Sequence, residues 1–346
     1  MKPVERILLS RMKYIGDVVL TTPVIRATRE AFPRAHIAYL AEKNAVSLLE
    51  HNPFLNEIIP YDFSRRDVIE QPRMMLKLRR MKFDAVVDFF SNPRTAMLMY
   101  ASGAPIRIGK SVKGRGRVYT HQIADDGKEK TAIEFHYAYV DPLGVKPTHF
   151  KPEIYLTDDE RREAKIFLRW QDVAGDKPVV GLHPGATWPA KMWEWERFAD
   201  LADLLIAKLG CQVLITQGPG DRELVEKISR KSVGSITILP VLPLRQLAAI
   251  LSQCSAYVAN DNGTMHIAAA VGTQTIGIFG PGEEQIWFPY TSRELYPSQH
   301  HRALRKDVPC HPCHLDYCNR AGDGYMECMK RLTVEEVFQA VRDILQ

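Results

Sequence analysis

Short apolar runs alternate with amphipathic stretches through the first half of the chain. Four runs of five or six residues are rich in apolar side chains, and stretches with helical periodicity separate them. Strands that alternate with helices are typical of βαβ units and of a parallel sheet. The expected strands are Arg6–Ser10, His36–Leu40, Glu57–Tyr61 and Asp84–Phe89, and the expected helices are Val18–Ala31, Asn44–His51 and Asp67–Met81.

The alternation stops after Pro142 and then begins again. Residues 143–160 are rich in proline and turn-forming residues and predict a linker. Five further apolar runs predict a second set of strands, so we expect an α/β protein with two Rossmann-like doubly wound domains, 1–170 and 171–346, that face each other across a cleft. Val334–Leu345 is a closing helix that could pack back on the first domain. The five runs are Val179–His183, Gln212–Thr216, Ser235–Leu239, Ala256–Ala259 and Thr275–Phe279.

Length and composition suit two globular domains. A chain of 346 residues is long for one compact domain. Its 45% apolar and 25% charged residues are ordinary for a globular protein, and no stretch approaches the ~18 apolar residues that a membrane-spanning helix needs. The N-terminus has only the short apolar run Ile7–Leu9, so no secretory signal is expected and the protein is predicted to be cytoplasmic.

Positive charge is concentrated in the first half. Residues 1–150 hold 24 lysines and arginines against 16 aspartates and glutamates, an excess of +8, within a total of +5. The densest run of basic residues is interpreted either as a solvated helix face or as a surface that attracts an anionic partner. Nucleic acid fits poorly, because no nucleic-acid motif accompanies the basic residues. The densest run comprises Arg65, Arg66, Arg73, Lys77, Arg79, Arg80 and Lys82.

The loop after the first expected strand is the first candidate for chemistry. Ligands of open α/β sheets bind beyond the carboxyl ends of the strands, where Lys13 to Asp17 fall. Gly16 permits a tight turn, and Asp17 comes at the start of a helix, so its carboxylate has two possible roles, helix capping and catalysis. The loop has neither a G-x-G-x-x-G run nor a P-loop.

A second candidate is the segment Gly181–Phe198, GLHPGATWPAKMWEWERF. Small residues form the turn after the strand, and Lys191 precedes a helix expected to begin near Trp195. Lys191 could place positive charge opposite a diphosphate, and the Thr187 hydroxyl could donate to phosphate oxygens. The alternatives are an exposed surface lysine and tryptophans that only pack.

The sharpest motif follows the strand expected to end at Asn260. The backbone N–H groups of the first helical turn are expected to be unpaired there, which favours an anion. Asp261 would repel a phosphate, so sugar hydroxyls are its expected partners. The alternative makes Asp261 a helix cap and His266 a core histidine. The candidate donor-binding residues of this turn are Asp261, Asn262, Gly263, Thr264, Met265 and His266.

A weaker signal is the glycine-rich segment Gln217–Glu223. Its glycines would let a nucleoside approach closely, and Asp221 or Glu223 could bind ribose hydroxyls. An ordinary turn explains the segment equally well.

Four cysteines near the C-terminus form the last group. They are open to three interpretations, namely a structural metal site, free thiols and a redox role. Their spacing lacks the paired C-x2-C form of common zinc ribbons. The cysteines are Cys310, Cys313, Cys318 and Cys328, and the nearby histidines are His300, His301, His311 and His314.

Five segments of the chain, in the same order, resemble glycosyltransferase family 9, the lipopolysaccharide heptosyltransferases, over nearly the whole chain. The resemblance implies the GT-B fold, with the acceptor mainly on the N-terminal domain and the donor mainly on the C-terminal one. It implies an ADP-heptose donor, an anionic Kdo- or heptose-bearing lipid acceptor, and inversion at the anomeric carbon with no metal and no cofactor. The matching segments are ILLSRMKYIGDVVLTTPVIRATREAFP, FDAVVDFFSNPRTAMLMYASGAPIRIG, HPGATWPAKMWEWERFADLA, NDNGTMHIAAAVGT with FGP, and the C-terminal C-x2-C…CM pattern.

The resemblance also implies roles for single residues. Asp17 falls on the family's proposed catalytic base, and Lys191 falls on its phosphate-binding lysine. The turn Asp261–Thr264 falls on the part that binds sugar and phosphate. This chain has Asn262 where many relatives carry Ser or Thr, so a hydroxyl contact at that position stays open.

The implied acceptor supplies a partner for the basic first half. Carboxylates and phosphates of a lipid A–core acceptor would be drawn to it, and Lys13, Arg79 and Arg80 are the candidate acceptor-binding residues. The enzyme is then expected to contact the inner membrane peripherally.

Other classes share parts of the pattern. A nicotinamide-dependent oxidoreductase has the same architecture, but neither half carries its glycine fingerprint. A non-catalytic nucleotide-sugar-binding or assembly protein needs no base, so the presence of both Asp17 and Lys191 argues against it. A transferase for a different sugar or acceptor stays open, because acceptor choice depends on loops outside the motifs.

Overall fold

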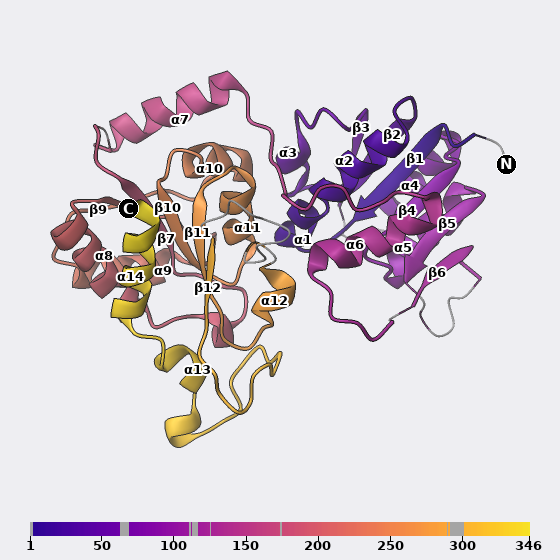
Figure 1. Cartoon of the computed structure of the whole chain (residues 1–346). Coiled ribbons are helices and arrows are strands. Elements are labelled where there is room, and N and C mark those ends of the chain that lie inside the picture. The colour runs from indigo at the N-terminus through magenta and orange to yellow at the C-terminus, as the bar shows by residue number, and fades with distance from the viewer. Residues whose placement is uncertain are drawn as a thin grey trace. The chain divides into compact units, whose positions relative to one another are not determined.

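The computed structural model describes residues 3–62, 69–110, 112, 117–124, 126–173, 175–288, 290 and 301–346. The chain folds into two units, Met1–Tyr155 and Leu156–Gln346 (Figure 1). The second unit begins earlier than the expected boundary at residue 171, because α7 (Asp158–Trp170) packs on α10 (Leu244–Leu251). Residues 156–170, which the expected boundary assigned to the first domain, therefore belong to the second unit.

The first unit is built on a six-stranded parallel sheet with the strand order β3-β2-β1-β4-β5-β6, which is the Rossmann order. All four expected strands are present. Strand β5 and the edge strand β6 were not expected, because both are short and partly exposed and lack a continuous apolar run. The strands are β1 (Arg6–Arg11), β2 (His36–Glu42), β3 (Glu57–Tyr61), β4 (Ala85–Asp88), β5 (Ile106–Lys110) and β6 (His121–Ile123).

Helices form two layers on this sheet. Helices α4 and α5 pack on β1 to β4 through a core that includes Leu8, Leu40, Leu78 and Met99, whereas α6 packs on β4, β5 and α2. The expected helix Val18–Ala31 is in fact two helices. The helices are α1 (Ile15–Leu20), α2 (Thr22–Ala31), α3 (Val46–Leu49), α4 (Glu70–Arg80), α5 (Pro93–Ser102), α6 (Ala132–Val140) and the 3₁₀ turn η1 (Asp141–Leu143).

The break between α1 and α2 has a local cause. The Thr21 hydroxyl donates to the Val18 carbonyl at 2.7 Å, and the Thr22 hydroxyl donates to the Val19 carbonyl at 2.8 Å. Pro23 has no N–H with which to continue the first helix, but it suits the first turn of a new one.

The second unit repeats the same strand order in a second parallel sheet, β12-β11-β10-β7-β8-β9. The five expected strands are present, and the short edge strand β12 is additional. The strands are β7 (Val179–His183), β8 (Gln212–Ile215), β9 (Ile236–Ile238), β10 (Ala256–Asn260), β11 (Gln274–Ile278) and β12 (Arg302–Leu304). The other helices are α8 (Trp195–Leu209), α9 (Arg222–Lys231), α11 (Gly263–Ala270), α12 (Glu284–Trp287), α13 (Glu327–Lys330), α14 (Val334–Leu345), η2 (Pro189–Lys191) and η4 (Gly322–Gly324).

The closing helix α14 belongs to the second unit. It packs on α8, β10 and β11, and its buried side chains Val337, Phe338 and Val341 join the core cluster of that sheet. Its apolar face is therefore buried within the second unit, and the prediction that this helix packs back on the first domain stays a prediction. No helix among the described residues is both long and apolar enough to cross a membrane.

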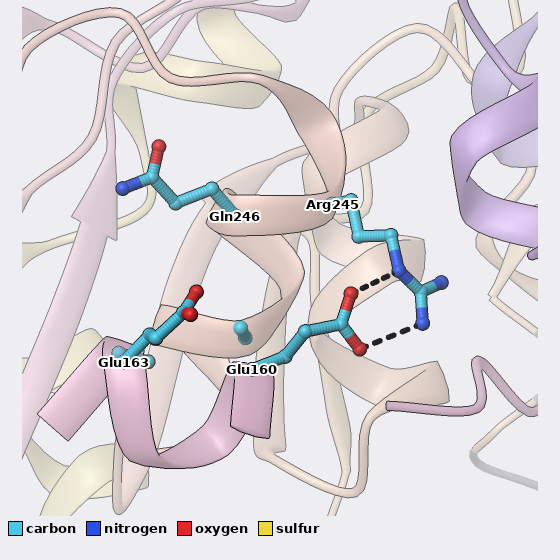
Figure 2. A pocket seen from close by; sticks show the side chains of 6 residues that line it. Glu160, Glu163, Arg245 and Gln246 are labelled. Carbon is cyan, nitrogen blue, oxygen red and sulfur yellow. Dashed lines mark hydrogen bonds and ion pairs between the residues drawn. The ribbon is translucent and has the colours of Figure 1, made fainter. Parts of the chain in front are cut away.

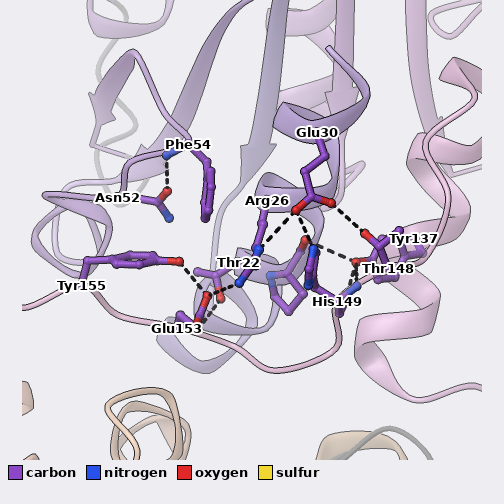
Figure 3. Close-up of polar contacts among 11 residues, drawn as sticks. Thr22, Arg26, Glu30, Asn52, Phe54, Tyr137, Thr148, His149, Glu153 and Tyr155 are labelled. Atoms are coloured by element: carbon purple, nitrogen blue, oxygen red, sulfur yellow. Dashed lines mark hydrogen bonds and ion pairs between the residues drawn. The ribbon is translucent and has the colours of Figure 1, made fainter. Parts of the chain in front are cut away.

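The expected linker is held along α2 of the first unit (Figure 3). His149 Nε2 lies 2.7 Å from the Glu30 carboxylate, and the Glu153 backbone N–H donates to the Thr22 hydroxyl at 3.0 Å. Because these contacts tie residues 144–155 to the first unit, the chain leaves that unit only at Tyr155.

Gly181 in β7 lies against the Tyr257 ring, and a Cβ on residue 181 would come within 2.6 Å of Tyr257 Cδ2. Gly181→Ala is expected to lower the free energy of unfolding of the second unit by about 1–3 kcal/mol, because an added methyl in a packed core forces its neighbours to shift. Denaturant unfolding followed by tryptophan fluorescence measures this, since all five tryptophans lie in that unit. Gly220→Ala is the matched control, because a Cβ there would meet no atom within 4 Å. Equal losses in both variants would contradict the packing argument.

Candidate active site

The strand order of each sheet reverses at one point, between β1 and β4 in the first unit and between β7 and β10 in the second. Loops diverge at such a point, and ligands of open α/β sheets bind there. The loop Lys13–Asp17 follows β1, the segment Pro184–Lys191 follows β7, and the turn at Asp261 follows β10. The second and third motifs therefore meet at one edge of one sheet.

Asp17 is the third residue of α1 and is only 8% exposed. Its Oδ2 accepts a hydrogen bond from the Tyr14 backbone N–H at 3.0 Å, and its Oδ1 forms an ion pair with Arg11 Nη2. The capping role is therefore present, although Tyr14 is the N-cap residue. Each carboxylate oxygen has two acceptor positions and uses one in these contacts, so Asp17 can still accept a proton from a ligand hydroxyl.

The loop after β4 is fixed by the buried carboxylate of Asp88. Its Oδ2 accepts a hydrogen bond from the Tyr119 hydroxyl at 2.7 Å, and its Oδ1 accepts from the backbone N–H groups of Phe90 and Ser91 at 3.1 and 2.9 Å. Burial raises the pKa of Asp88, although these hydrogen bonds oppose the rise. The Arg11 guanidinium lies 5.1 Å from the centre of the Phe90 ring, so this loop helps to hold the partner of Asp17.

The candidate acceptor-binding arginines lie at the opposite edge of the sheet from Asp17. Arg79 and Arg80 are exposed at the end of α4, which leads to the amino end of β4. The Arg79 guanidinium lies beside Gly103 at the end of α5, so it also has a structural role. Of the basic run, Arg65 and Arg66 lie outside the described residues.

Other cations lie at the carboxyl edge of this sheet. Lys13 is exposed in the loop after β1, and Lys110 is the exposed last residue of β5. Arg94, in the first turn of α5, donates to the Tyr61 hydroxyl at 3.1 Å. Sequence reasoning missed Arg94 and Lys110 because isolated cations carry no pattern, and in the case of Lys110 the strand that places it was not expected.

In the second unit, Lys191 and Asp261 form a buried ion pair. Their Nζ and Oδ2 atoms are 2.5 Å apart, and the two side chains are 18% and 7% exposed. Lys191 Nζ also lies 4.4 Å from the centre of the Trp188 ring, a cation–π contact. The alternative of an exposed surface lysine is therefore wrong. Because an ammonium has three N–H donors, Lys191 can contact a ligand while it keeps Asp261.

The start of α11 differs from expectation. Asn262 is the N-cap, and its Oδ1 accepts hydrogen bonds from the backbone N–H groups of Thr264 and Met265 at 3.0 and 3.2 Å. The prediction that these N–H groups are unpaired is wrong, because the amide side chain supplies the acceptor that a helix N-terminus lacks. The alternative in which Asp261 is the cap is wrong for the same reason. Asn262 Nδ2 donates to the Gly185 carbonyl at 2.8 Å, which ties the turn to the loop after β7.

A buried chain of hydrogen bonds lies beneath this turn. The Tyr257 hydroxyl donates to Thr264 Oγ1 at 3.0 Å and lies 2.8 Å from Thr216 Oγ1, which in turn is 2.9 Å from His183 Nδ1. The Thr264 hydroxyl donates to Asn262 Oδ1 at 2.8 Å. The Thr216 hydroxyl has one proton and two acceptors within reach, the Leu182 carbonyl at 3.2 Å and the Tyr257 oxygen, and Thr216 Oγ1 can accept a hydrogen bond from His183 Nδ1–H. The chain links the ends of β7, β8 and β10 to the cap of α11.

Asp221 is turned towards its own loop. Its Oδ2 accepts from the Gly218 backbone N–H at 2.7 Å and lies 3.7 Å from His183 Nε2. A Cβ on residue 185 would come within 2.3 Å of the same carboxylate, so Asp221 packs tightly between the loops after β7 and β8. These contacts fit the turn interpretation, and a ribose contact stays a prediction.

Two other predicted residues have simple surroundings. Thr187 is exposed in the loop between β7 and η2. His266 is buried, with its Nδ1 3.1 Å from the Tyr290 hydroxyl, as the core interpretation predicted. The donor contacts proposed for both residues stay predictions.

The cysteine segment borders the same edge of the sheet. The Cys313 backbone N–H donates to the Pro281 carbonyl at 3.2 Å, and the Ala190 N–H donates to the Asp316 carbonyl at 3.0 Å. Burial raises the pKa of the Cys328 thiol, and the three other thiols of the segment add to the rise. All six cysteines are free, and no group of three or more His, Cys, Asp or Glu side chains in the described part of the chain is arranged to hold a metal ion.

A pocket of about 400 Å³ lies between α7 and α10 (Figure 2). Arg245 Nη2 is 2.8 Å from Glu160 Oε2, and a second bond joins Arg245 Nε to the same carboxylate. Burial opposes ionisation of Glu160, but hydrogen bonds from Arg245 and Thr157 outweigh it and lower its pKa to about 2. The Glu160–Arg245 pair in this pocket holds α7 against α10 within the second unit.

Two units with the same Rossmann order define an α/β protein of the GT-B fold. A glycosyl transferase family 9 protein from Veillonella parvula has a TM-score of 0.85 at 24% identity, over 99% of this chain and 97% of that one. The ADP-heptose lipopolysaccharide heptosyltransferase II of Escherichia coli has a TM-score of 0.78 at 21% identity, over 99% and 98% of the two chains.

Sequence comparison defines the family. Lipopolysaccharide heptosyltransferase 3 of Escherichia coli K12 is 27% identical over 298 residues, which are 81% of this chain and 84% of that protein. The family model of glycosyltransferase family 9 (heptosyltransferase) matches residues 72–312. This chain therefore belongs to glycosyltransferase family 9 and is an enzyme of the glycosyltransferase class, as the resemblance implied.

His183 supplies a pH test of the buried chain of hydrogen bonds. Burial lowers the pKa of His183 to about 4, although Asp221 opposes the shift, whereas a free histidine has a pKa of about 6.5. The unfolded chain therefore binds more protons between these values, so stability is complete above pH ~6.5 and is lost as the pH falls towards 4, by up to about 3 kcal/mol. Tryptophan-detected unfolding from pH 4 to 7 should show a shallower slope for His183→Asn than for wild type. The control is His121→Gln, an exposed residue of β6, and a wild-type slope in His183→Asn would contradict the assignment.

Proposed function

We propose that this chain transfers heptose from ADP-heptose to the inner core of lipopolysaccharide, onto Kdo or heptose, with inversion at the anomeric carbon. The observation that carries the proposal is the buried Lys191–Asp261 ion pair. It joins two separate motifs at the point between β7 and β10 where the strand order of the second sheet reverses, which we call the switch point. Membership of glycosyltransferase family 9 supplies the reaction class. The names of the similar proteins, which include ADP-heptose and lipopolysaccharide, support the donor and the kind of acceptor.

The donor is assigned to the second unit. Negative charge builds on the departing ADP as the glycosidic bond breaks, and Lys191 offers a fixed ammonium to the diphosphate without a metal ion. Asp261 orients that ammonium and can accept hydrogen bonds from sugar hydroxyls. Thr187, exposed on the same loop, can donate to a phosphate oxygen. One well-placed donor of this kind contributes about 2.7–4 kcal/mol in other enzymes.

Asp17 is assigned as the general base. A sugar hydroxyl is a poor nucleophile, so a carboxylate that accepts its proton during attack lowers the barrier. The Arg11 ion pair and the Tyr14 N–H fix the direction of the carboxylate. A fixed base loses little conformational freedom when the acceptor binds.

The acceptor is assigned to the carboxyl edge of the first sheet. Lys13, Arg94 and Lys110 lie at this edge with Asp17, whereas Arg79 and Arg80 lie at the other. The anionic groups of the inner core would meet the first set. Because this acceptor is a lipid, the enzyme works at a membrane surface, which we place on the cytoplasmic side of the inner membrane.

Asp17→Asn is expected to lower turnover by about 10²–10⁴-fold, because general base catalysis contributes that much, and to leave the dissociation constant of ADP unchanged. Initial rates of ADP release and calorimetric titration with ADP measure the two quantities. Arg11→Gln is the control, since it removes the ion pair but keeps the carboxylate, and it should lose less turnover. Turnover of Asp17→Asn within about threefold of wild type would show that the base is another group.

Lys191→Ala is expected to weaken ADP binding by roughly 10–100-fold and to slow transfer, because a hydrogen bond to a charged group contributes about 1.5–3 kcal/mol. The exposed Lys208 of α8 is the matched control, and Lys208→Ala should bind ADP as wild type does.

An unchanged ADP dissociation constant in Lys191→Ala would remove the lysine from the donor site. In the same assay EDTA should leave wild-type transfer unaffected, and a strict requirement for Mg²⁺ or Mn²⁺ would contradict the assignment of the diphosphate to Lys191.

A further inference from the structure

The outer face of α4 and α5 exposes an unusual amount of apolar surface. Ile69, the N-cap residue of α4, and Leu76 on α4 are 53% and 51% exposed, and Met97 and Tyr100 on α5 are 53% and 60% exposed. The two helices are neighbours on one face of the first sheet, and Gln71 Nε2 of α4 lies 4.0 Å from Met97 Sδ of α5 (Figure 1). A large exposed apolar patch marks an interaction surface.

Cations share this face with the apolar side chains. At 100° per residue, Ile69, Arg73, Leu76, Lys77 and Arg80 lie within an arc of about 100° on α4. Met74 and Leu78, on the opposite side, are buried in the core. The face is therefore both apolar and basic, and it lies in the half of the chain with the excess of +8.

The cations of this face are available to a partner. Among the residues that the structure describes, Arg73 and Arg80 form no ion pair, and Lys77 only reaches Glu57 at 3.9 Å. On α9, by contrast, Arg222 pairs with Glu226 at 3.1 Å and Lys227 pairs with Glu223 at 3.0 Å.

Helix α7 is the other candidate for an exposed apolar interaction surface, because its Trp170 is 78% exposed. Its basic residues are interleaved with acids, and Arg162 pairs with Asp159 within the helix. Its first turn consists of acidic residues. The charge on α7 is therefore locally balanced, whereas that on α4 is not.

We infer that the outer face of α4 and α5 docks on a bilayer surface that carries anionic headgroups. Such a surface offers negative charge over a wide area together with an apolar layer just beneath it, which matches basic and apolar side chains on one helix face. Tyr100 suits the boundary between the two layers, because its ring is apolar and its hydroxyl is polar. This inference rests on the proposed function only for the reason why the enzyme would dock, since a lipid-linked acceptor must be reached at a membrane.

The test is flotation of the full chain with vesicles of phosphatidylcholine alone and with about one third phosphatidylglycerol. We expect binding to the anionic vesicles only, and at least tenfold weaker partition at 0.5 M salt, because screening shortens the reach of the charges. Arg73→Glu/Lys77→Glu/Arg80→Glu and Leu76→Ser/Met97→Ser should each reduce partition at least tenfold. The matched control is Arg222→Glu/Lys227→Glu/Arg230→Glu on α9, which makes the same change in net charge and should retain most of the binding.

The outcomes separate this inference from the proposed function. Transfer to a soluble, deacylated core acceptor should be unchanged in both α4–α5 variants. Equal loss of binding in the α4 and α9 charge variants would overturn the assignment of this face, as would binding that is indifferent to lipid charge. Self-association that the Leu76→Ser/Met97→Ser variant abolishes, without vesicle binding by wild type, would make the face a contact between copies of the chain instead. Vesicle binding without any transfer activity would leave this inference standing and reject the proposed function.

Discussion

Parallel pairing places the carboxyl end of every strand at one edge of its sheet. At this edge the buried strands end and the exposed loops begin. Polar groups there are partly desolvated and must find partners. In the first unit, the Asp88 carboxylate accepts hydrogen bonds from backbone N–H groups of the loop after β4. In the second unit, the buried chain of hydrogen bonds that runs from His183 to Asn262 supplies partners for polar side chains at the ends of three strands. The reactive side chains thus stand on loops whose own hydrogen bonds are already made.

Each unit carries a buried acid and a cation together at its switch point. In the first unit Arg11 holds Asp17, and in the proposed mechanism the acid reacts while the cation orients it. In the second unit Asp261 holds Lys191, and here the cation acts while the acid orients it. Pairing lowers the cost of burying either charge, which explains how both can be fixed in place without a ligand. The two pairs suit the two halves of a transfer, a proton taken from the acceptor and negative charge received by the leaving group.

Much of this arrangement could be predicted from the sequence. Central parallel strands are buried on both faces, so their apolar runs identified β1, β7 and β10 and thereby the loops that carry Asp17, Lys191 and Asp261. What could not be predicted depends on single contacts. Nothing in a one-dimensional pattern shows that Asn262 turns back to cap α11, or that Thr21 and Pro23 divide one apolar stretch into two helices. Strand β5, which ends at Lys110, is short and only partly buried, and the place of α7 follows from the Glu160–Arg245 bond across 85 residues.

The most direct test of the central claim is the product. The purified chain is incubated with ADP-heptose and a panel of truncated core acceptors, and ADP release is measured together with the mass and anomeric configuration of the product. The account predicts ADP in equal amount to a heptosylated core of inverted configuration, formed only with acceptors that present Kdo or heptose. Binding of ADP-heptose without product on any acceptor, or a product of retained configuration, would contradict it.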